Sequence, residues 1–288
     1  MVPRHVFVPI EDHEIHVCEW GDPSKPALVM WHGLARTGRD FDELAEAFSS
    51  EWFVLCPDTI GRGLSSWGTE ADYSVSNYAG LAVKLLDAYG IERAGWIGTS
   101  MGALIAMWIA AGEDAERLDW FVINDIGPDV PQDALDRILE YAAGDPPRIP
   151  TVAKAEAALR TVYAPFGPAS DAFWQRMART SVRRLPDGAL TIHYDPAMTA
   201  MMTTHRAELS VWDRWERITC PVHLCVGATS DILPRDQAER MRQTGPKPEI
   251  TWWEECGHAP TLSRPADIDI VRDIVAKLSL RAEGARQI

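Results

Sequence analysis

A serine between two glycines is the first place where this sequence could carry out covalent chemistry. Ser100 stands in Gly98-Thr-Ser100-Met-Gly102, with an apolar run before it and a helix-like run, residues 101–110, after it. This context predicts a strand that turns sharply into a helix, with the serine hydroxyl exposed at the bend. Both flanking positions must be small, because a side chain there would collide with neighbouring backbone. Ser100 is therefore a candidate nucleophile, and the alternative is that it only caps a helix.

Two further reactive residues follow predicted strands. Asp231 comes after the apolar run 221–226, and His258 comes after the run 249–253. In a parallel sheet the loops that follow the strands emerge at one edge, so residues far apart in sequence meet in one crevice. We therefore expect Ser100, Asp231 and His258 to lie close together.

The elements that must position these residues alternate between strands and helices, which predicts an α/β fold with a mostly parallel central sheet flanked by helices. Continuous apolar runs are typical of strands that are covered on both faces. The expected strands cover residues 6–10, 14–20, 27–31, 52–57, the run before Ser100, 118–123, 221–226 and 249–253.

The pattern changes between residues 129 and 210. Three amphipathic helices are expected there, over 133–143, 152–163 and 171–185, with no buried strand among them. We interpret 129–210 as a helical cap, or lid, inserted after the sixth strand into a core domain that consists of residues 1–128 and 211–288.

Composition narrows the possible partners. The 288 residues carry a formal net charge of −14, which disfavours nucleic acid as a partner. No apolar run is long enough to span a membrane, and the N-terminus does not resemble a signal peptide. Five cysteines without a CxxC pattern indicate reduced thiols, so a cytoplasmic location is expected. No metal or organic cofactor is implied, and the sequence leaves the oligomeric state open.

Several motifs in a fixed order resemble the α/β-hydrolase superfamily, in particular its serine esterases and lipases with a helical cap. The resemblance covers nearly the whole chain. Its motifs are His32-Gly33, Asp58-x-x-Gly61-x-Gly63-x-Ser65, Gly98-x-Ser100-x-Gly102, Gly227-x-x-x-Asp231-x-x-Pro234 and Gly257-His258.

The resemblance implies a role for each reactive residue. His258 would take the proton of Ser100 and later deliver it to the leaving group, and Asp231 would orient the imidazole. Asp125 also follows a strand and is the alternative acid. The backbone N–H groups of Leu34 and Met101 would form the oxyanion hole.

The substrate pocket is less well defined by sequence. Apolar and aromatic residues of the cap, including Trp174 and Tyr194, are candidates for its lining, and so is His193 at the end of the cap. His32 is a further pocket candidate, although the resemblance gives His-Gly a structural role beside the oxyanion loop. An apolar lining would suit apolar substrates better than charged ones.

These residues together predict a serine hydrolase that cleaves carboxylic esters of small to medium apolar substrates through an acyl-enzyme on Ser100. Two alternatives use the same three residues, Ser100, His258 and Asp231. They are hydrolysis of a carbon–carbon bond in ring-cleavage diketones and acyl transfer to an alcohol or thiol. A third alternative belongs to another class, a ligand-binding receptor that keeps the fold without useful turnover. The small-molecule substrate itself is not identified by sequence.

Overall fold

The central element of the fold is a sheet of eight strands, in the order β1-β2-β4-β3-β5-β6-β9-β10. The computed structural model describes residues 2–144 and 146–286. Strands β1 and β2 form an antiparallel hairpin, β2 pairs antiparallel with β4, and the remaining neighbours are parallel. The strands are β1 Arg4–Ile10, β2 His13–Trp20, β3 Ala27–Trp31, β4 Phe53–Pro57, β5 Ala94–Thr99, β6 Leu118–Asn124, β9 Val222–Gly227 and β10 Glu249–Trp253. The expected α/β-hydrolase sheet is confirmed.

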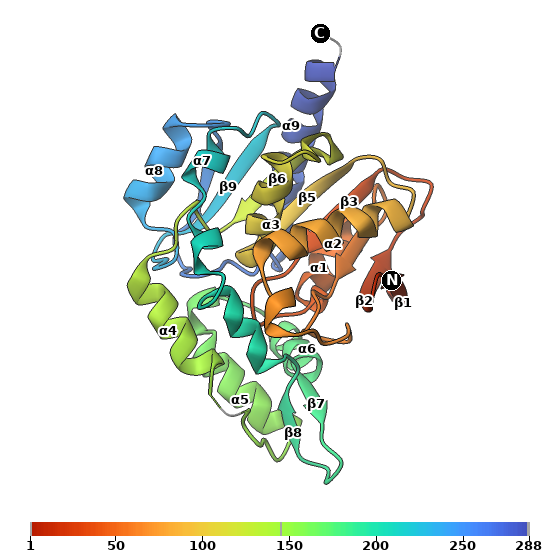
Figure 1. The fold of residues 1–288 in the computed structure, drawn as a ribbon, viewed down its shortest axis with the longest axis vertical. Helices are drawn as coiled ribbons and strands as arrows, with labels where there is room; N and C mark the ends of the chain where they lie inside the picture. Colours follow the sequence, from red (N-terminus) through yellow and green to blue (C-terminus); the bar gives the residue numbers. More distant parts are fainter. Residues whose placement is uncertain (1, 145, 287–288) are drawn as a thin grey trace.

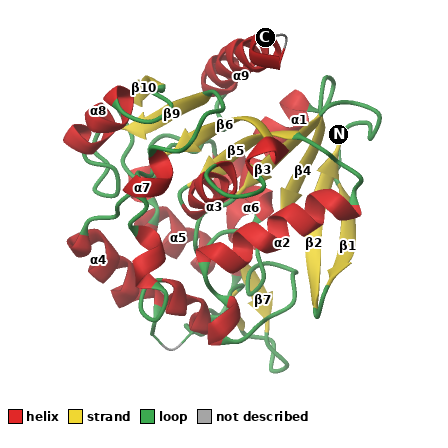
Figure 2. Ribbon diagram, turned by 45° about the horizontal axis from the view of Figure 1, so that its top comes forward, coloured by secondary structure: helices red, strands yellow, loops and turns green. Residues whose placement is uncertain are grey.

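Helices cover both faces of this sheet, which explains why the central strands are continuously apolar (Figures 1 and 2). Alternate residues of one strand enter opposite cores. Val29 packs in the core beneath α2 and α3, whereas Leu28 packs in the core beneath α1 and α9. The helices around the sheet are α1 Asp42–Phe48, α2 Val75–Ala88, α3 Met101–Ala110, α7 Trp212–Trp215, α8 Arg235–Gln243 and α9 Pro265–Arg286.

The segment between β6 and α7 contains the three expected helices, α4 Gln132–Ala142, α5 Val152–Val162 and α6 Asp171–Thr180. Its two ends meet, because Asp129 and Ser210 form an antiparallel bridge. In Figure 1 this green segment projects from one edge of the sheet. Short 3-10 helices complete the chain at Gly38–Phe41, Glu70–Asp72, Ala115–Arg117, Ala164–Phe166, Pro196–Met201 and Arg206–Leu209.

The segment also contains a hairpin that the sequence pattern did not predict. We expected a helix over 171–185, but α6 ends at Thr180 and the strands β7 (Val182–Arg184) and β8 (Leu190–Ile192) pair antiparallel. The turn between them includes Gly188, whose φ is 89°. Pro186-Asp187-Gly188 is a strong turn sequence, since proline and glycine supply the required backbone angles, and it joins β7 to β8.

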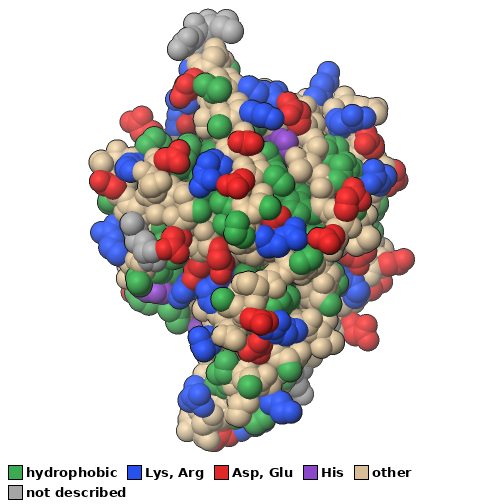
Figure 3. Space-filling model, turned by 180° about the vertical axis from the view of Figure 1, so that it is seen from behind, with side chains coloured by type: hydrophobic (Ala, Val, Ile, Leu, Met, Phe, Trp, Pro, Cys, Tyr) green, Lys and Arg blue, Asp and Glu red, His purple; other side chains and the backbone are tan. Residues whose placement is uncertain are grey.

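Charges of both signs are interspersed over the face seen in Figure 3. The excess of acidic residues, 42 against 28 lysines and arginines, is therefore not separated from the basic ones on this face. None of the helices in the described parts of the chain combines the length and apolar character needed to cross a bilayer.

Candidate active site

Ser100 occupies a strained turn between β5 and α3. Its φ is 52°, a left-handed value that is rare for a residue with a side chain. The two glycines make this turn possible. A Cβ at Gly98 would lie 2.4 Å from the backbone of α3, and one at Gly102 would lie 2.1 Å from the carbonyl oxygen of Trp31 in β3. The predicted steric role of both glycines is confirmed.

A continuous chain of hydrogen bonds starts at this serine. His258, in the loop after β10, places Nε2 3.0 Å from Ser100 Oγ. Its other ring nitrogen, Nδ1, lies 2.9 Å from Asp125 Oδ2. Asp125 follows β6 directly and is fully buried, and its Oδ1 accepts the N–H of Gly227 at 2.9 Å. Because Asp125 accepts from Nδ1–H, Nε2 is left free to accept the serine proton.

The prediction that Asp231 is the partner of His258 is wrong, and the alternative acid Asp125 takes that place. Asp231 is half exposed and forms an ion pair with Arg137 of α4 instead. The reason is the order of the strands. Asp125 is the first residue after β6, the neighbour of β5, whereas Asp231 lies in a loop four residues beyond the end of β9.

The proposed oxyanion donors border the same point. Met101 is the first residue of α3, so its N–H has no acceptor within the helix. Leu34 follows β3 and lines the cavity next to Ser100. The backbone approaches closely here, because a Cβ on Gly33 would lie 3.5 Å from the Ser100 Cβ. Whether the two N–H groups bind an oxyanion stays a prediction.

A buried arginine that the sequence analysis did not single out holds this region in place. Arg62 is completely buried, and its Nε donates to the carbonyl oxygen of Leu34 at 2.8 Å. Its Nη1 donates to Ile60 O and Tyr78 Oη, and its Nη2 lies 3.6 Å from Met101 Sδ. Arg62 thus contacts both residues of the predicted oxyanion hole. Arg62 lies between Gly61 and Gly63 of the Asp58 motif, so this motif was the sequence feature that could have identified it.

His32 braces the same loop and does not line the main cavity. Its Nε2 accepts the N–H of Thr59 at 2.9 Å, and its Nδ1 lies 2.7 Å from Gly33 O. These contacts place the proton on Nδ1. Burial lowers the pKa of His32 to about 4, so the ring is neutral at neutral pH. The structural role is confirmed, and the assignment of His32 to the substrate pocket is wrong.

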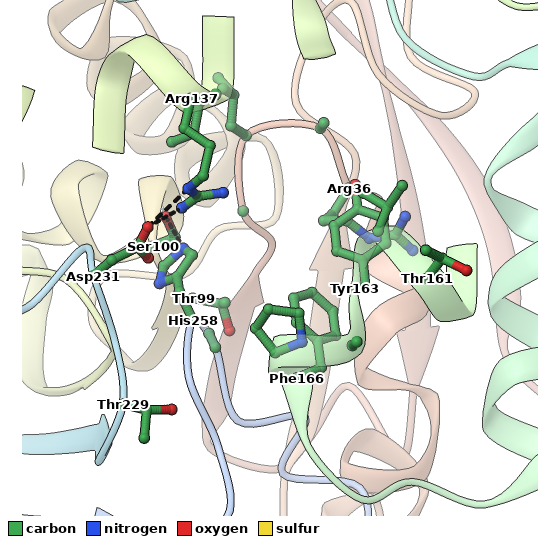
Figure 4. Close-up of a pocket in the computed structure, with 18 residues that line it drawn as sticks. Arg36, Thr99, Ser100, Arg137, Thr161, Tyr163, Phe166, Thr229, Asp231 and His258 are labelled. Carbon is green, nitrogen blue, oxygen red and sulfur yellow. Dashed lines mark hydrogen bonds and ion pairs between the residues drawn. The ribbon is translucent and has the colours of Figure 1, made fainter. Parts of the chain in front are cut away.

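A cavity of about 720 Å³ opens beside Ser100 (Figure 4). The core contributes the loops after β3, β5, β9 and β10, and the segment 129–210 contributes α4 and the end of α5. The lining consists of Gly33, Leu34, Ala35, Arg36, Thr99, Ser100, Arg137, Ile138, Thr161, Val162, Tyr163, Ala164, Pro165, Phe166, Thr229, Asp231, His258 and Ala259.

The other three pocket candidates lie elsewhere. Trp174 packs in a small core with Phe173 and Met177. His193 lines a separate cavity, and burial lowers its pKa. Tyr194 lines a neighbouring cavity that shares Tyr163 with the main one. These predictions are wrong for the cavity at Ser100, because the sequence assigns the three residues to the segment 129–210 without saying which of its surfaces faces Ser100.

A second, smaller recess also borders the serine. It has a volume of about 30 Å³ and a mostly apolar wall. Besides Ser100, its lining includes Met101, Leu104, Ile126, Val130, Leu135, Met201, Met202, Leu209 and Ile232. Ser100 therefore lies between a large cavity that contains charged groups and a narrow apolar one.

One group among the described residues could offer ligand atoms to a metal ion. His5, His16 and Cys18 on the β1–β2 hairpin bring their ligand atoms within 4.8 Å of one another. Two of these atoms already contact each other, since His5 Nδ1 and His16 Nε2 lie 2.8 Å apart. His5 and His16 line a cavity separate from the one at Ser100.

The fold and this site define a hydrolase of the α/β class, and comparison with known proteins agrees. The chain belongs to the alpha/beta hydrolase family, whose model matches residues 28–268. It is 37% identical over 283 residues to the 3-hydroxybutyrate-oligomer hydrolase of Cupriavidus necator, and the match covers 93% of this chain and 96% of that protein.

Solved structures show the same architecture. An alpha/beta hydrolase from Novosphingobium aromaticivorans superimposes with a TM-score of 0.83 and 30% identity, covering 96% of this chain and 99% of that one. E-2-(acetamidomethylene)succinate hydrolase shares the fold with a TM-score of 0.81 and 21% identity, covering 96% and 98% of the two chains.

Proposed function

We propose that this protein is a serine hydrolase that cleaves carboxylic esters through an acyl-enzyme on Ser100. The observation that carries the proposal is the unbroken hydrogen-bond chain from Ser100 through His258 to the buried Asp125. A serine hydroxyl is a weak nucleophile at neutral pH, and an adjacent oriented histidine is the usual way to activate it. Cytoplasmic location and independence of cofactors stay predictions.

In the first half-reaction Ser100 Oγ attacks the ester carbonyl carbon while its proton passes to His258 Nε2. Asp125 stabilises the imidazolium that forms. The N–H groups of Leu34 and Met101 would stabilise the negative oxygen of the tetrahedral intermediate. The bond between the carbonyl carbon and the leaving oxygen then breaks, and the Nε2 proton passes to that oxygen. An alcohol leaves and the acyl group stays on Ser100.

In the second half-reaction water replaces the alcohol. His258 takes a proton from water as the water oxygen attacks the acyl carbon, and it returns that proton to Ser100 Oγ as the acyl bond breaks. The product is a carboxylic acid. We further propose that residues 129–210 act as the cap of this site, since two of their helices supply one wall of the cavity.

The substrate class that best fits is a short ester of a hydroxy acid. The Cupriavidus necator relative is a 3-hydroxybutyrate-oligomer hydrolase and aligns over nearly the full length of both chains. The cavity volume of about 720 Å³ is within the usual range for small-molecule sites, about 300–1,000 Å³. The narrow apolar recess next to Ser100 would accept a small apolar group such as a methyl.

The test is turnover of p-nitrophenyl butyrate and of a 3-hydroxybutyrate dimer by the native chain and by Ser100→Ala, with fluorophosphonate labelling of Ser100 in parallel. We expect turnover that Ser100→Ala reduces at least about 1,000-fold. Labelling without hydrolysis of any ester would move the assignment to a ring-cleavage diketone or an acyl acceptor. Absence of both ester turnover and labelling of Ser100 would contradict the proposed enzymatic function and favour a ligand-binding receptor.

A further inference from the structure

Two arginines line the cavity at Ser100 in a chain whose formal net charge is −14. Figure 4 shows them on different sides, with Arg36 beside Tyr163 and Arg137 beside Asp231. An arginine in a substrate cavity is a natural partner for a carboxylate, because its donors match the two oxygens. The question is which of the two has donors left for a substrate.

Arg36 is already engaged. Its Nε and Nη2 donate to the two carboxylate oxygens of Asp40, at 2.7 and 2.6 Å, and its guanidinium lies over the ring of Tyr163. Burial disfavours its charge, but Asp40 offsets this and raises the pKa of Arg36 further. Arg36 therefore stays charged and committed to a full bidentate pair.

Arg137 is held differently. Both its Nε and its Nη2 contact a single oxygen, Asp231 Oδ2, at 2.7 and 2.6 Å. Figure 4 shows the remaining guanidinium nitrogen pointing away from Asp231, and it has no hydrogen-bond partner in the described parts of the chain. Both side chains are about half exposed. A substrate in the cavity can therefore reach an oriented donor without breaking the pair.

Arg137 lies on the side of the cavity where the alcohol portion of the ester is expected to bind. Asp231 follows β9, which lies in the sheet between β6, the strand before Asp125, and β10, the strand before His258. Arg137 is fixed to this side of the cavity by its pair with Asp231. In the proposed reaction His258 delivers its proton to the leaving oxygen, so the alcohol portion of the ester lies on the His258 side.

We propose, on the basis of the proposed esterase function, that Arg137 binds a carboxylate on the alcohol portion of the substrate. A 3-hydroxy acid ester dimer carries its free carboxylate there, a short spacer away from the leaving oxygen. Asp231 orients the guanidinium. The favoured substrates are thus free-acid oligoesters, a proposal that differs from the sequence-based expectation that apolar substrates suit the site better than charged ones.

The experiment compares a 3-hydroxybutyrate dimer acid with the same dimer ending in a neutral carboxamide. The native chain is expected to have the higher kcat/KM on the acid, and Arg137→Gln to lower the acid-to-carboxamide ratio about tenfold, through KM. Added salt raises KM for the acid in the native chain only, since screening weakens a charge contact.

Arg148→Gln is the matched control, because it breaks another ion pair of the same segment, with Asp187, outside the cavity lining. It should leave the ratio unchanged. Equal kcat/KM values on the two dimers in the native chain, or an equal loss on both in Arg137→Gln, would overturn the carboxylate site. If the native chain still hydrolyses neutral p-nitrophenyl butyrate, such a result overturns only the carboxylate site. If it does not, the proposed esterase function itself fails.

Discussion

Asp125 and His258 are joined by a 2.9 Å hydrogen bond although 133 residues separate them in the chain. The strand order brings them together, since β6 and β10 both flank β9. Asp125 is fully buried, whereas Asp231, at the same edge of the sheet, faces solvent and Arg137. Asp125 therefore contacts His258, whereas Asp231 contacts Arg137. Replacing each carboxylate in turn tests the two contacts separately.

Asp125→Asn is expected to lower kcat on p-nitrophenyl butyrate about 10⁴-fold, because an asparagine N–H would favour the wrong tautomer of His258. Asp231→Asn is expected to keep kcat within about threefold on the same ester, since no contact links it to His258 in the described structure. Steady-state rates on both variants decide the matter. A larger loss in Asp231→Asn than in Asp125→Asn would reverse the assignment of the acid.

Gly102→Ala is expected to lower the free energy of unfolding by about 1–3 kcal/mol, because its methyl would lie 2.1 Å from Trp31 O and force β3 away from α3. Gly80→Ala is the control. Gly80 lies in the exposed part of α2 with nothing within 4 Å of an added Cβ, and alanine there should stabilise by about 0.5–1 kcal/mol. Urea unfolding of both variants measures the difference, and equal effects would contradict the steric account.

Arg62→Lys is expected to reduce kcat about 10- to 100-fold, because lysine cannot hold Leu34 O, Ile60 O and Tyr78 at once. The loss should be less than the effect of deleting an oxyanion donor outright. Arg62 is a positioning residue, so binding of a transition-state analogue should weaken more than KM rises.

Arg117→Lys provides the comparison for that variant. Arg117 also donates to two backbone carbonyls, those of Ile91 and Glu92, but it lies outside the cavity lining. Its replacement should change stability without changing analogue affinity. If both arginine variants weaken the analogue equally, the link between Arg62 and the oxyanion hole is lost.

Acid is expected to destabilise the fold between about pH 6.5 and 4. Burial lowers the pKa of His32 and of His223 to about 4 in the folded chain, while the unfolded chain binds these protons near pH 6.5. In this window the unfolded state holds more protons, so the free energy of unfolding falls as the pH falls, by up to about 1.4 kcal/mol per pH unit for each histidine.

His223→Gln should remove about one histidine's share of this slope, since glutamine does not titrate and can still hydrogen-bond to Thr251. Urea unfolding at several pH values between 4 and 7 gives the two slopes. Identical slopes for the native chain and His223→Gln would show that His223 takes up its proton equally in both states.

The proposed nucleophile and the proposed base could be located in the sequence because their signals are local. The glycines around Ser100 permit one kind of backbone turn, and His258 follows the last strand of an alternating pattern. The partner of His258 was assigned wrongly, because Asp125 and Asp231 both follow strands and the loop motif favoured Asp231. The distinction depends on which side chain is buried against the histidine, and only tertiary structure decides that.

Other features depend on contacts between distant segments. The carbonyl of Leu34 needs a donor, and Arg62 supplies it from another loop. The pocket candidate Trp174 failed because helix periodicity identifies an apolar face without saying which neighbour it packs against. His193 and Tyr194 follow β8, and their place at the end of the segment 129–210 did not say which cavity they line. The β7–β8 hairpin is different, since its turn residues Pro186-Asp187-Gly188 were visible in the sequence, while the residues of β7 were predicted to be helical.

The second oxygen of Asp125 has a consequence beyond orienting His258. It accepts the N–H of Gly227, and so it ties the end of β6 to the end of β9. A motion that separates β6 from β9 would leave the buried carboxylate of Asp125 without the N–H of Gly227. The same motion would disturb the hydrogen bond between Asp125 and His258. On the proposed function, loss of activity on heating is therefore expected to coincide with separation of β6 from β9 at this edge of the sheet.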